Sequence, residues 1–371
     1  MSSNRTHKLV LGFAHWGSAE VPIADMIETV GFAVKNGITE IDCAPHYGNG
    51  AQENVLGVAL LTLPEALRSQ VKISTKAARV IDPDTKAAST NGFTQSSGFA
   101  QVFDYSKAGI EKSFQQSQLR LGLSSVHALY LHDIDKGTHR ENQAGHYQTF
   151  VTGGCTAFAN LKAQKKIAVA GIGSNDVDVC VQLIRDGRFQ IDRIMLAGCF
   201  NLLSFSALDE LFPLCQQKNI KLYIAAPYGG GILSNQPGNT VYRYENADVE
   251  TLRRVAKIKS LCEAFKVSLA HAAMQFVHSH PQVERVVVGA RTVAELKASL
   301  EYAEQPIAQA FWEALRQASL IPALPSSAIV ASAPNARLAA LLGHFRDAVP
   351  APEMKEGSAA DVNAVLPRAA L

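Results

Sequence analysis

Several features that would place a chain in a special class are scarce or missing in this sequence of 371 residues. Charged residues make up only 18%, and the 35 basic and 33 acidic residues are scattered, which leaves a formal net charge of +2. No basic strip could follow a phosphate backbone, so nucleic acid is not an expected partner. The 6 cysteines include no CxxC pair and no histidine at zinc-ligand spacing, so we expect reduced thiols and no metal.

Long apolar runs are missing too. No stretch approaches the ~18 apolar residues that cross a membrane, and the N-terminus shows no apolar core of the kind that a secretory signal has. We therefore expect a cytoplasmic protein without a membrane segment. The hydrophobic fraction of 47%, by contrast, is ample for a globular core.

Short apolar segments alternate along the chain with longer segments of helical period. Several of the short segments lack polar alternation, as expected for strands covered on both faces. The eight candidate strands are residues 9–14, 38–43, 71–75, 128–131, 167–172, 191–197, 221–225 and 283–288. Apolar residues recur at intervals of three and four, as on half-buried helices, in residues 23–35, 105–121, 177–186, 207–217, 249–265 and 292–302.

This alternation of strand and helix predicts an α/β fold, the (β/α)8 TIM barrel. The alternative is an open doubly wound sheet, but the phosphate-binding pattern GxGxxG is missing where residues 12–17 read GFAHWG. We expect the barrel to span residues 1–320, followed by an Ala- and Pro-rich extension over residues 321–371. A long insertion at residues 77–104 follows the third strand, and we expect it to close over a substrate.

Four polar residues stand at or just beyond the ends of predicted strands. Asp42 ends the second strand and Tyr47 follows it, whereas Lys76 ends the third strand and His132 the fourth. In a parallel barrel the carboxyl ends of all strands surround one mouth, where the catalytic side chains gather. These four side chains should therefore meet.

Their chemistry suits the transfer of a hydride to or from a carbonyl carbon. Reduction leaves an alkoxide that needs a proton, and a phenol supplies it if a neighbouring ammonium lowers the phenol pKa. A carboxylate holds the ammonium in place, and an imidazole orients the substrate oxygen. We therefore predict an oxidoreductase with Tyr47 as its acid and base.

The motifs around these residues resemble the aldo-keto reductase family. IDCAPHYGNGAQENVLGVAL, ISTKAARV, LYLHDID, KKIAVAGIGSN, APYGGGIL and VVVGARTVAEL follow one another in the family's order, over roughly residues 8 to 318. The resemblance implies a nicotinamide cofactor and a tetrad of Tyr47, Lys76, Asp42 and His132. It is closest to the branch of D-threo-aldose, L-galactose and pyridoxal dehydrogenases, which implies oxidation of a C1 hemiacetal to a lactone.

The same resemblance assigns binding residues. Cofactor contacts are expected from Gly173, Ser174, Asn175, Pro227, Tyr228, Gly229, Gly231, Leu233, Gly289, Arg291 and Glu295. Trp16 and His46 are expected to contact the substrate. The chain reads Cys199-Phe200-Asn201 where aldose dehydrogenases of this type often have Arg-Tyr-Thr, and Ala197 where many members have Gln.

The preferred cofactor is expected to be NAD, with NADP as the alternative. Glu295 would repel a 2′-phosphate and accept hydrogen bonds from ribose hydroxyls, whereas Arg291 would attract the phosphate. The resemblance also leaves open a general aldehyde reductase that uses NADPH, and a cofactor-binding regulatory subunit with slow turnover. A small-molecule substrate and a monomer or homodimer are expected.

Overall fold

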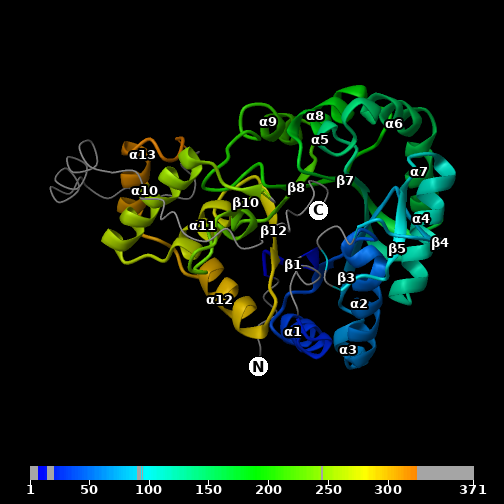
Figure 1. Ribbon diagram of the computed structural model, residues 1–371, viewed down its shortest axis with the longest axis horizontal. Coiled ribbons are helices and arrows are strands. Elements are labelled where there is room, and N and C mark those ends of the chain that lie inside the picture. Colours follow the sequence, from blue (N-terminus) through cyan, green and yellow to red (C-terminus); the bar gives the residue numbers. More distant parts are fainter. Residues whose placement is uncertain (1–6, 15–20, 90–92, 94, 244, 324–371) are drawn as a thin grey trace.

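A closed barrel of parallel strands forms the centre of the computed structural model, which describes residues 7–14, 21–89, 93, 95–243 and 245–323 (Figure 1). The barrel strands are β1 (Leu9–Gly12), β2 (Glu40–Asp42), β3 (Lys72–Ala77), β6 (Val126–His132), β7 (Ile167–Ser174), β8 (Arg193–Ala197), β9 (Lys221–Ala225) and β12 (Val283–Gly289). They are ordered β1-β12-β9-β8-β7-β6-β3-β2, and β1 pairs with both β12 and β2. The predicted fold class and all eight strands are confirmed.

Helices surround the barrel on the outside, as Figure 1 shows. They are α1 (Ile23–Lys35), α2 (Ala51–Thr62), α3 (Glu65–Arg68), α4 (Lys107–Leu121), α5 (Lys136–His139), α6 (Gln143–Thr149), α7 (Cys155–Ala163), α8 (Val177–Asp186), α9 (Leu211–Gln217), α10 (Val249–Phe265), α11 (Leu269–His278), α12 (Val293–Glu304) and α13 (Gln309–Gln317). The predicted helix at residues 207–217 begins only at Leu211. Pro213 explains the late start, because a helix accepts proline without strain only in its first turn.

Local signals in the sequence account for several helix ends. The side chain of Ser106 accepts a hydrogen bond from the backbone N–H of Gly109, which starts α4 at Lys107. Ser268 caps α11 in the same way. Gly187 follows α8 with a left-handed φ of 74°, which a side chain would disfavour.

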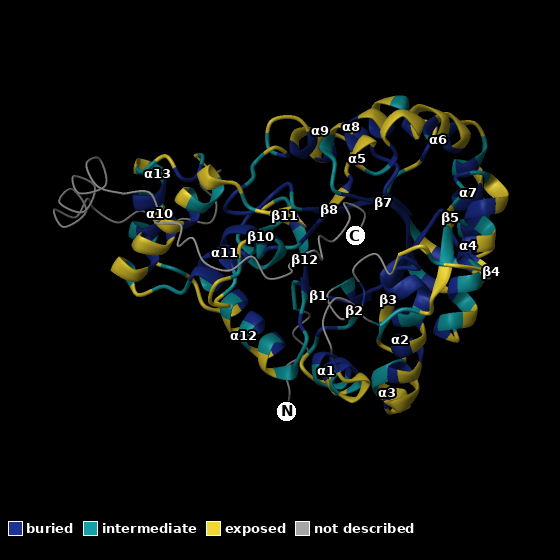
Figure 2. Cartoon of the chain, viewed as in Figure 1, coloured by how far each residue is buried: buried dark blue, intermediate teal, exposed yellow. Residues whose placement is uncertain are grey.

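Burial follows the layers of the fold: the barrel strands are buried, and the helices are exposed on their outward sides (Figure 2). A large cluster of apolar side chains fills the space between strands and helices. A second cluster, which includes Val10, Tyr130, Met195 and Tyr223, packs inside the barrel. The barrel interior is thus a packed core, and a substrate can approach only at an end of the strands.

The insertion after β3 is more regular than its composition predicted. It forms an antiparallel hairpin of β4 (Arg79–Lys86) and β5 (Phe99–Phe103). The hairpin docks on the turn that follows β2, where Asn49 Nδ2 donates to the Phe99 carbonyl at 2.8 Å and Ser97 N donates to the Gly48 carbonyl at 2.9 Å. A smaller hairpin of β10 (Val241–Tyr242) and β11 (Glu245–Asn246) follows β9. The insertion therefore borders the end of the barrel where the predicted catalytic residues lie.

Three further findings concern the described part of the chain. No helix there has the length and apolar character needed to cross a membrane. No group of three or more His, Cys, Asp or Glu side chains in those residues could hold a metal ion. All six cysteines are free thiols, and five of them are buried.

Trp16 and most of the predicted extension over residues 321–371 lie outside the described residues.

Candidate active site

The four predicted catalytic side chains meet at the carboxyl end of the barrel strands. Asp42 is the last residue of β2 and His132 the last of β6, while Lys76 is the penultimate residue of β3. Tyr47 begins the short 3-10 turn η2 (Tyr47–Gly50). Gly48 in this turn has a φ of 61°, and a Cβ there would lie 2.2 Å from the Gln95 carbonyl oxygen, so the turn requires glycine.

Lys76 is the centre of the cluster and uses all of its hydrogen-bonding capacity. Its Nζ lies 2.6 Å from Asp42 Oδ2, 3.1 Å from the Cys43 carbonyl oxygen and 2.9 Å from the Tyr47 hydroxyl. An ammonium has three N–H donors and no acceptor, so the Tyr47 oxygen must accept the third bond. The Tyr47 proton therefore remains available for another acceptor. The second Asp42 oxygen accepts from Ser74 Oγ at 2.6 Å.

The expected lowering of the Tyr47 pKa is not what this structure shows. Burial raises the pKa of Tyr47 well above its usual value, and the nearby Asp42 carboxylate raises it further. Tyr47 is only 2% exposed, so the phenolate would lose nearly all its hydration. In this arrangement Tyr47 is held as the protonated phenol.

His132 lies across the site from Tyr47, with the two ring centroids 6.4 Å apart and nearly perpendicular. Burial lowers the pKa of His132 well below its usual value, and the Arg79 and Lys76 cations lower it further. The imidazole is therefore neutral at neutral pH. Among the described residues neither ring nitrogen has a hydrogen-bond partner, although Nε2 lies 3.3 Å from Asp133 Oδ2.

A chain of hydrogen bonds from the insertion fixes the tautomer of His46. Asn49 Nδ2 donates to the Phe99 carbonyl, so Asn49 Oδ1 is free to accept, and it accepts a hydrogen bond from Gln101 Nε2. The Gln101 oxygen then faces His46 Nδ1 at 2.9 Å, which places the imidazole proton on Nδ1. The His46 ring stands 6.0 Å from that of His132, measured between centroids. The structure thus brings His46 to the site; Trp16 lies outside the described residues.

The sequence did not predict three residues that the structure places in this site. Arg79 donates to Asp133 Oδ2 at 2.5 Å, and both side chains are buried beside His132. Phe93 packs against the rings of His46 and Tyr47, with centroid distances of 5.4 and 6.0 Å. Asp133 could have been found, because it directly follows the strand-end residue His132. Arg79 and Phe93 belong to the insertion after β3, and no local sequence pattern indicates how this insertion folds.

The residues predicted at the end of β7 reach the same mouth. Gly173 pairs with His132 across the strands, and Ser174 is buried as the last residue of β7. Asn175 follows, and its side-chain Oδ1 is buried without a hydrogen-bond partner among the described residues. An amide donor of a bound nicotinamide would satisfy this oxygen. Ala197, which stands where many members of the family have Gln, is a small, buried residue at the end of β8.

The glycine triplet after β9 forms a tight turn, η5 (Gly229–Gly231). All three glycines have left-handed φ values, 61°, 80° and 111°. The absence of side chains leaves this backbone open to close approach by a pyrophosphate. Tyr228 anchors the turn through its hydroxyl, 2.9 Å from Ser299 Oγ. Pro227 and Leu233, which flank the turn, are buried.

The third predicted cofactor segment joins β12 to α12. Gly289 ends β12, and Thr292 caps α12 by accepting a hydrogen bond from the Glu295 N–H. Glu295 holds both the side chain and the backbone of Arg291: Oε1 lies 2.7 Å from Arg291 Nη2, and Oε2 accepts the Arg291 backbone N–H at 2.8 Å. The charges of Arg291 and Glu295, which predicted opposite preferences between NADP and NAD, thus neutralise each other.

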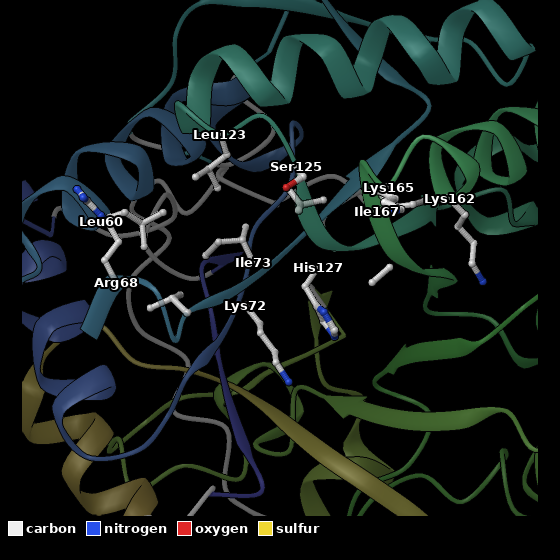
Figure 3. A pocket seen from close by; sticks show the side chains of 13 residues that line it. Leu60, Arg68, Lys72, Ile73, Leu123, Ser125, His127, Lys162, Lys165 and Ile167 are labelled. Atoms are coloured by element: carbon white, nitrogen blue, oxygen red, sulfur yellow. The ribbon is translucent and has the colours of Figure 1, made fainter. Parts of the chain in front are cut away.

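A separate cavity of about 530 Å³ lies at the opposite end of the barrel. Its lining includes Lys72, Val126 and Ile167, the first residues of β3, β6 and β7, so it does not contain the tetrad. Figure 3 shows Lys72 and His127 near its centre, with Arg68 and Lys162 on opposite sides. The cations do not converge on one point.

Comparisons with known proteins agree with the geometry. The chain is 33% identical to pyridoxal 4-dehydrogenase of Microbacterium luteolum over 327 residues, which cover 84% of this chain and 94% of that protein. It is 32% identical to D-threo-aldose 1-dehydrogenase of a Pseudomonas species over 293 residues, 77% of this chain and 85% of that one.

A solved structure shares the fold. An aldo-keto reductase from Bacillus halodurans, in its holo form, superposes with a TM-score of 0.65 at 21% identity, covering 86% of this chain and 94% of that one. Residues 8–320 match the profile of the aldo/keto reductase family. The chain therefore belongs to the aldo/keto reductase family of nicotinamide-dependent oxidoreductases.

Proposed function

We propose that this protein is an NAD-preferring dehydrogenase that oxidises the C1 hemiacetal carbon of an aldose, or of a similar cyclic hemiacetal, to a lactone. The observation that carries the proposal is the placement of Lys76, which leaves the Tyr47 proton transferable beside the neutral imidazole of His132. The substrate class rests on the similarity to pyridoxal 4-dehydrogenase and D-threo-aldose 1-dehydrogenase.

Each member of the tetrad has a role that follows from its contacts. In the oxidative direction Tyr47 accepts the proton of the C1 hydroxyl, and in the reductive direction it donates a proton to the carbonyl oxygen. Lys76 holds the Tyr47 oxygen in place, and Asp42 holds Lys76. His132, as a neutral imidazole, can hydrogen-bond the same substrate oxygen and orient it.

The residues at the end of β7, at the glycine turn and before α12 fit a dinucleotide. Asn175 Oδ1 needs a donor, and Gly229–Gly231 present bare backbone. When bound, the nicotinamide supplies the acceptor for the hydride that leaves C1. The residues after β12 would hold the adenosine end, where the start of α12 favours negative charge.

The rates of the two directions should depend differently on pH. Oxidation needs Tyr47 as phenolate, and because burial raises its pKa, the phenolate fraction below that pKa increases about tenfold per pH unit. We expect kcat/KM for oxidation to rise through pH 7 to 9 without a plateau, whereas reduction stays flat near neutral pH. Initial rates in both directions measure this. A plateau of the oxidative rate near pH 7 would contradict a raised pKa.

The cofactor preference should depend on Glu295. Its carboxylate pairs with Arg291 and so keeps the guanidinium from binding a 2′-phosphate, but both side chains are partly exposed, so the effect is moderate. We expect NAD to be favoured by about 5- to 30-fold in kcat/KM, or roughly 1–2 kcal/mol. Glu295→Gln should raise the efficiency with NADP by about 5- to 10-fold, because it releases Arg291.

A matched control for this variant lies on the same helix. Glu301 is an exposed glutamate of α12 six residues farther along, and Glu301→Gln should leave the NAD to NADP ratio unchanged. Kinetics with each cofactor measure both variants. A preference for NADP in the unchanged protein, or no gain with Glu295→Gln, would refute the role of Glu295.

The function itself is tested by a substrate screen. Aldoses, pyridoxal and plain aldehydes are offered in both directions with NAD and NADP, and the absorbance of the reduced nicotinamide is followed. We expect turnover of an aldose or pyridoxal with NAD, and a lactone as the product by mass spectrometry. Fast turnover of plain aldehydes alone with NADPH would identify an aldehyde reductase instead, and turnover of none of them would favour a cofactor-binding regulatory protein.

A further inference from the structure

A cluster of buried polar atoms surrounds His132, and the roles given above use only the imidazole of His132 itself. Within the described residues, both ring nitrogens of His132, Oδ1 of Asp133 and Nε of Arg79 are buried without a hydrogen-bond partner. Buried polar groups are almost always paired, because an unpaired one loses its hydration without compensation. Several such atoms in one place, next to the reacting groups, indicate a ligand that carries polar groups of its own.

The backbone places Asp133 in this cluster at a conformational cost. Asp133 has a φ of 44°, which few residues other than glycine adopt. Its surroundings enforce the conformation: its N–H donates to the Gly173 carbonyl at 3.1 Å, and its own carbonyl oxygen lies 2.8 Å from the Tyr105 hydroxyl and 2.9 Å from His139 Nε2. Strain that is held in this way is typical of functional positions.

Arg79 reaches the cluster by a comparable route. The preceding residue, Ala78, has a φ of 87°, which turns the chain from β3 into the hairpin. The guanidinium carbon lies 4.4 Å from the centroid of the Phe103 ring, and Nη2 donates to Asp133 Oδ2. Left-handed backbone conformations, at Asp133 itself and at Ala78 before Arg79, thus bring the two side chains together beside His132.

Stability does not explain this pair. A buried ion pair gains little over an apolar pair of the same size, because both ions lose their hydration. Burial raises the pKa of Asp133 to about 6 although the Arg79 cation opposes this, which shows how costly the carboxylate is at this position. The pair also carries no net charge, so it does not favour an anionic ligand. A hydroxyl group, which both donates and accepts, complements one guanidinium donor and one carboxylate acceptor.

We propose that Arg79 and Asp133 bind a hydroxyl group of the substrate next to its reacting carbon, and thereby select hydroxylated aldehydes and hemiacetals over plain aldehydes. This inference rests on the proposed function and assigns the substrate selection to two residues outside the tetrad. Asp133 Oδ1 accepts the hydrogen bond of the hydroxyl, and Arg79 Nε donates to its oxygen. A substrate without that hydroxyl leaves both groups unpaired, which is the strongest basis of discrimination that a polar site has.

The test compares two substrates that differ by one hydroxyl, 2-hydroxypropanal and propanal, in the reductive direction with NADH. The readout is the ratio of their kcat/KM values, because a general loss of activity cancels in the ratio. We expect the unchanged protein to favour 2-hydroxypropanal by about 10- to 100-fold. Arg79→Lys keeps the charge but removes the Nε donor, and it should lower the ratio by about 10-fold.

A second variant protects the test against misfolding. Asp133→Asn alone leaves Arg79 buried without its counter-ion, so the double variant Arg79→Met with Asp133→Leu is made as well, in which an apolar pair replaces the ionic one. We expect its ratio to fall to about 1, with an unfolding midpoint in urea only modestly below that of the unchanged protein, because leucine adopts the left-handed φ at position 133 less readily than aspartate.

Arg193 provides the matched control. It is an almost fully buried arginine in β8, 3.6 Å from Glu40 and stacked on Tyr223, and it lies at the other end of the barrel. Arg193→Lys should leave the ratio unchanged.

The outcomes separate the two proposals. If aldoses are oxidised but all variants keep the kcat/KM ratio of the unchanged protein, Arg79 and Asp133 do not bind the substrate hydroxyl. This inference is then wrong, while the proposed function stands. An equal fall of kcat/KM for both substrates shows a structural role only, which also overturns it. If no hydroxylated substrate reacts at all, the proposed function and this inference fall together.

Discussion

Replacing Tyr47 by phenylalanine should lower turnover by about 10²- to 10⁴-fold while cofactor binding survives. The variant keeps the ring that packs against Phe93 and His132 and removes only the hydroxyl. That hydroxyl accepts from Lys76 and holds the one proton that can pass to a substrate oxygen. Steady-state rates in both directions measure the loss, and titration of the reduced cofactor by fluorescence measures its binding.

Tyr147 offers a matched control for this variant. It is also a buried tyrosine, but it lies on α6 and its hydroxyl donates to Asp186 at 3.3 Å, away from the barrel mouth. Tyr147→Phe should keep near-normal turnover. If Tyr47→Phe kept near-normal turnover as well, another group would have to move the proton, and Tyr47 would lose its assigned role.

Replacing Lys76 by methionine should damage both the activity and the fold. The change leaves the Asp42 carboxylate buried, with Ser74 as its remaining side-chain partner. Removal of one member of a buried ion pair typically lowers the free energy of unfolding by about 3–5 kcal/mol. Turnover should fall by about 10²- to 10⁴-fold, since the Tyr47 oxygen is no longer held. Urea unfolding and steady-state kinetics check the two effects separately.

A double variant separates the fold from the chemistry. Adding Asp42→Asn to Lys76→Met removes the uncompensated charge, so part of the lost unfolding free energy should return while turnover stays low. Lys72→Met, an exposed lysine at the start of the same strand, should change neither quantity. Recovery of turnover in the double variant would show that Lys76 serves the fold alone.

Much of the architecture could be predicted because its signals are local. Strand β9 and helices α1, α8 and α10 begin and end at the residues that the apolar periodicity predicted. These bounds are predictable because apolar spacing and helix capping act over only one or two turns of the chain. The tetrad followed from one topological rule, that the carboxyl ends of barrel strands share a mouth. The hairpin of β4 and β5 was not predicted, because only Arg79, Val80 and Ile81 of its strand residues are buried, so the strands lack a continuous apolar pattern.

The sequence by itself determined the order of strands and helices, the barrel, and the meeting of Asp42, Tyr47, Lys76 and His132. Only the tertiary structure decided the surroundings that set their chemistry. The contacts between Gln101 and His46, and between Arg79 and Asp133, join segments more than 50 residues apart, and no local pattern encodes such pairs. The direction of the Tyr47 pKa was also decided there, because desolvation depends on how many groups from distant elements cover the hydroxyl, and this burial outweighs the neighbouring ammonium that the sequence revealed.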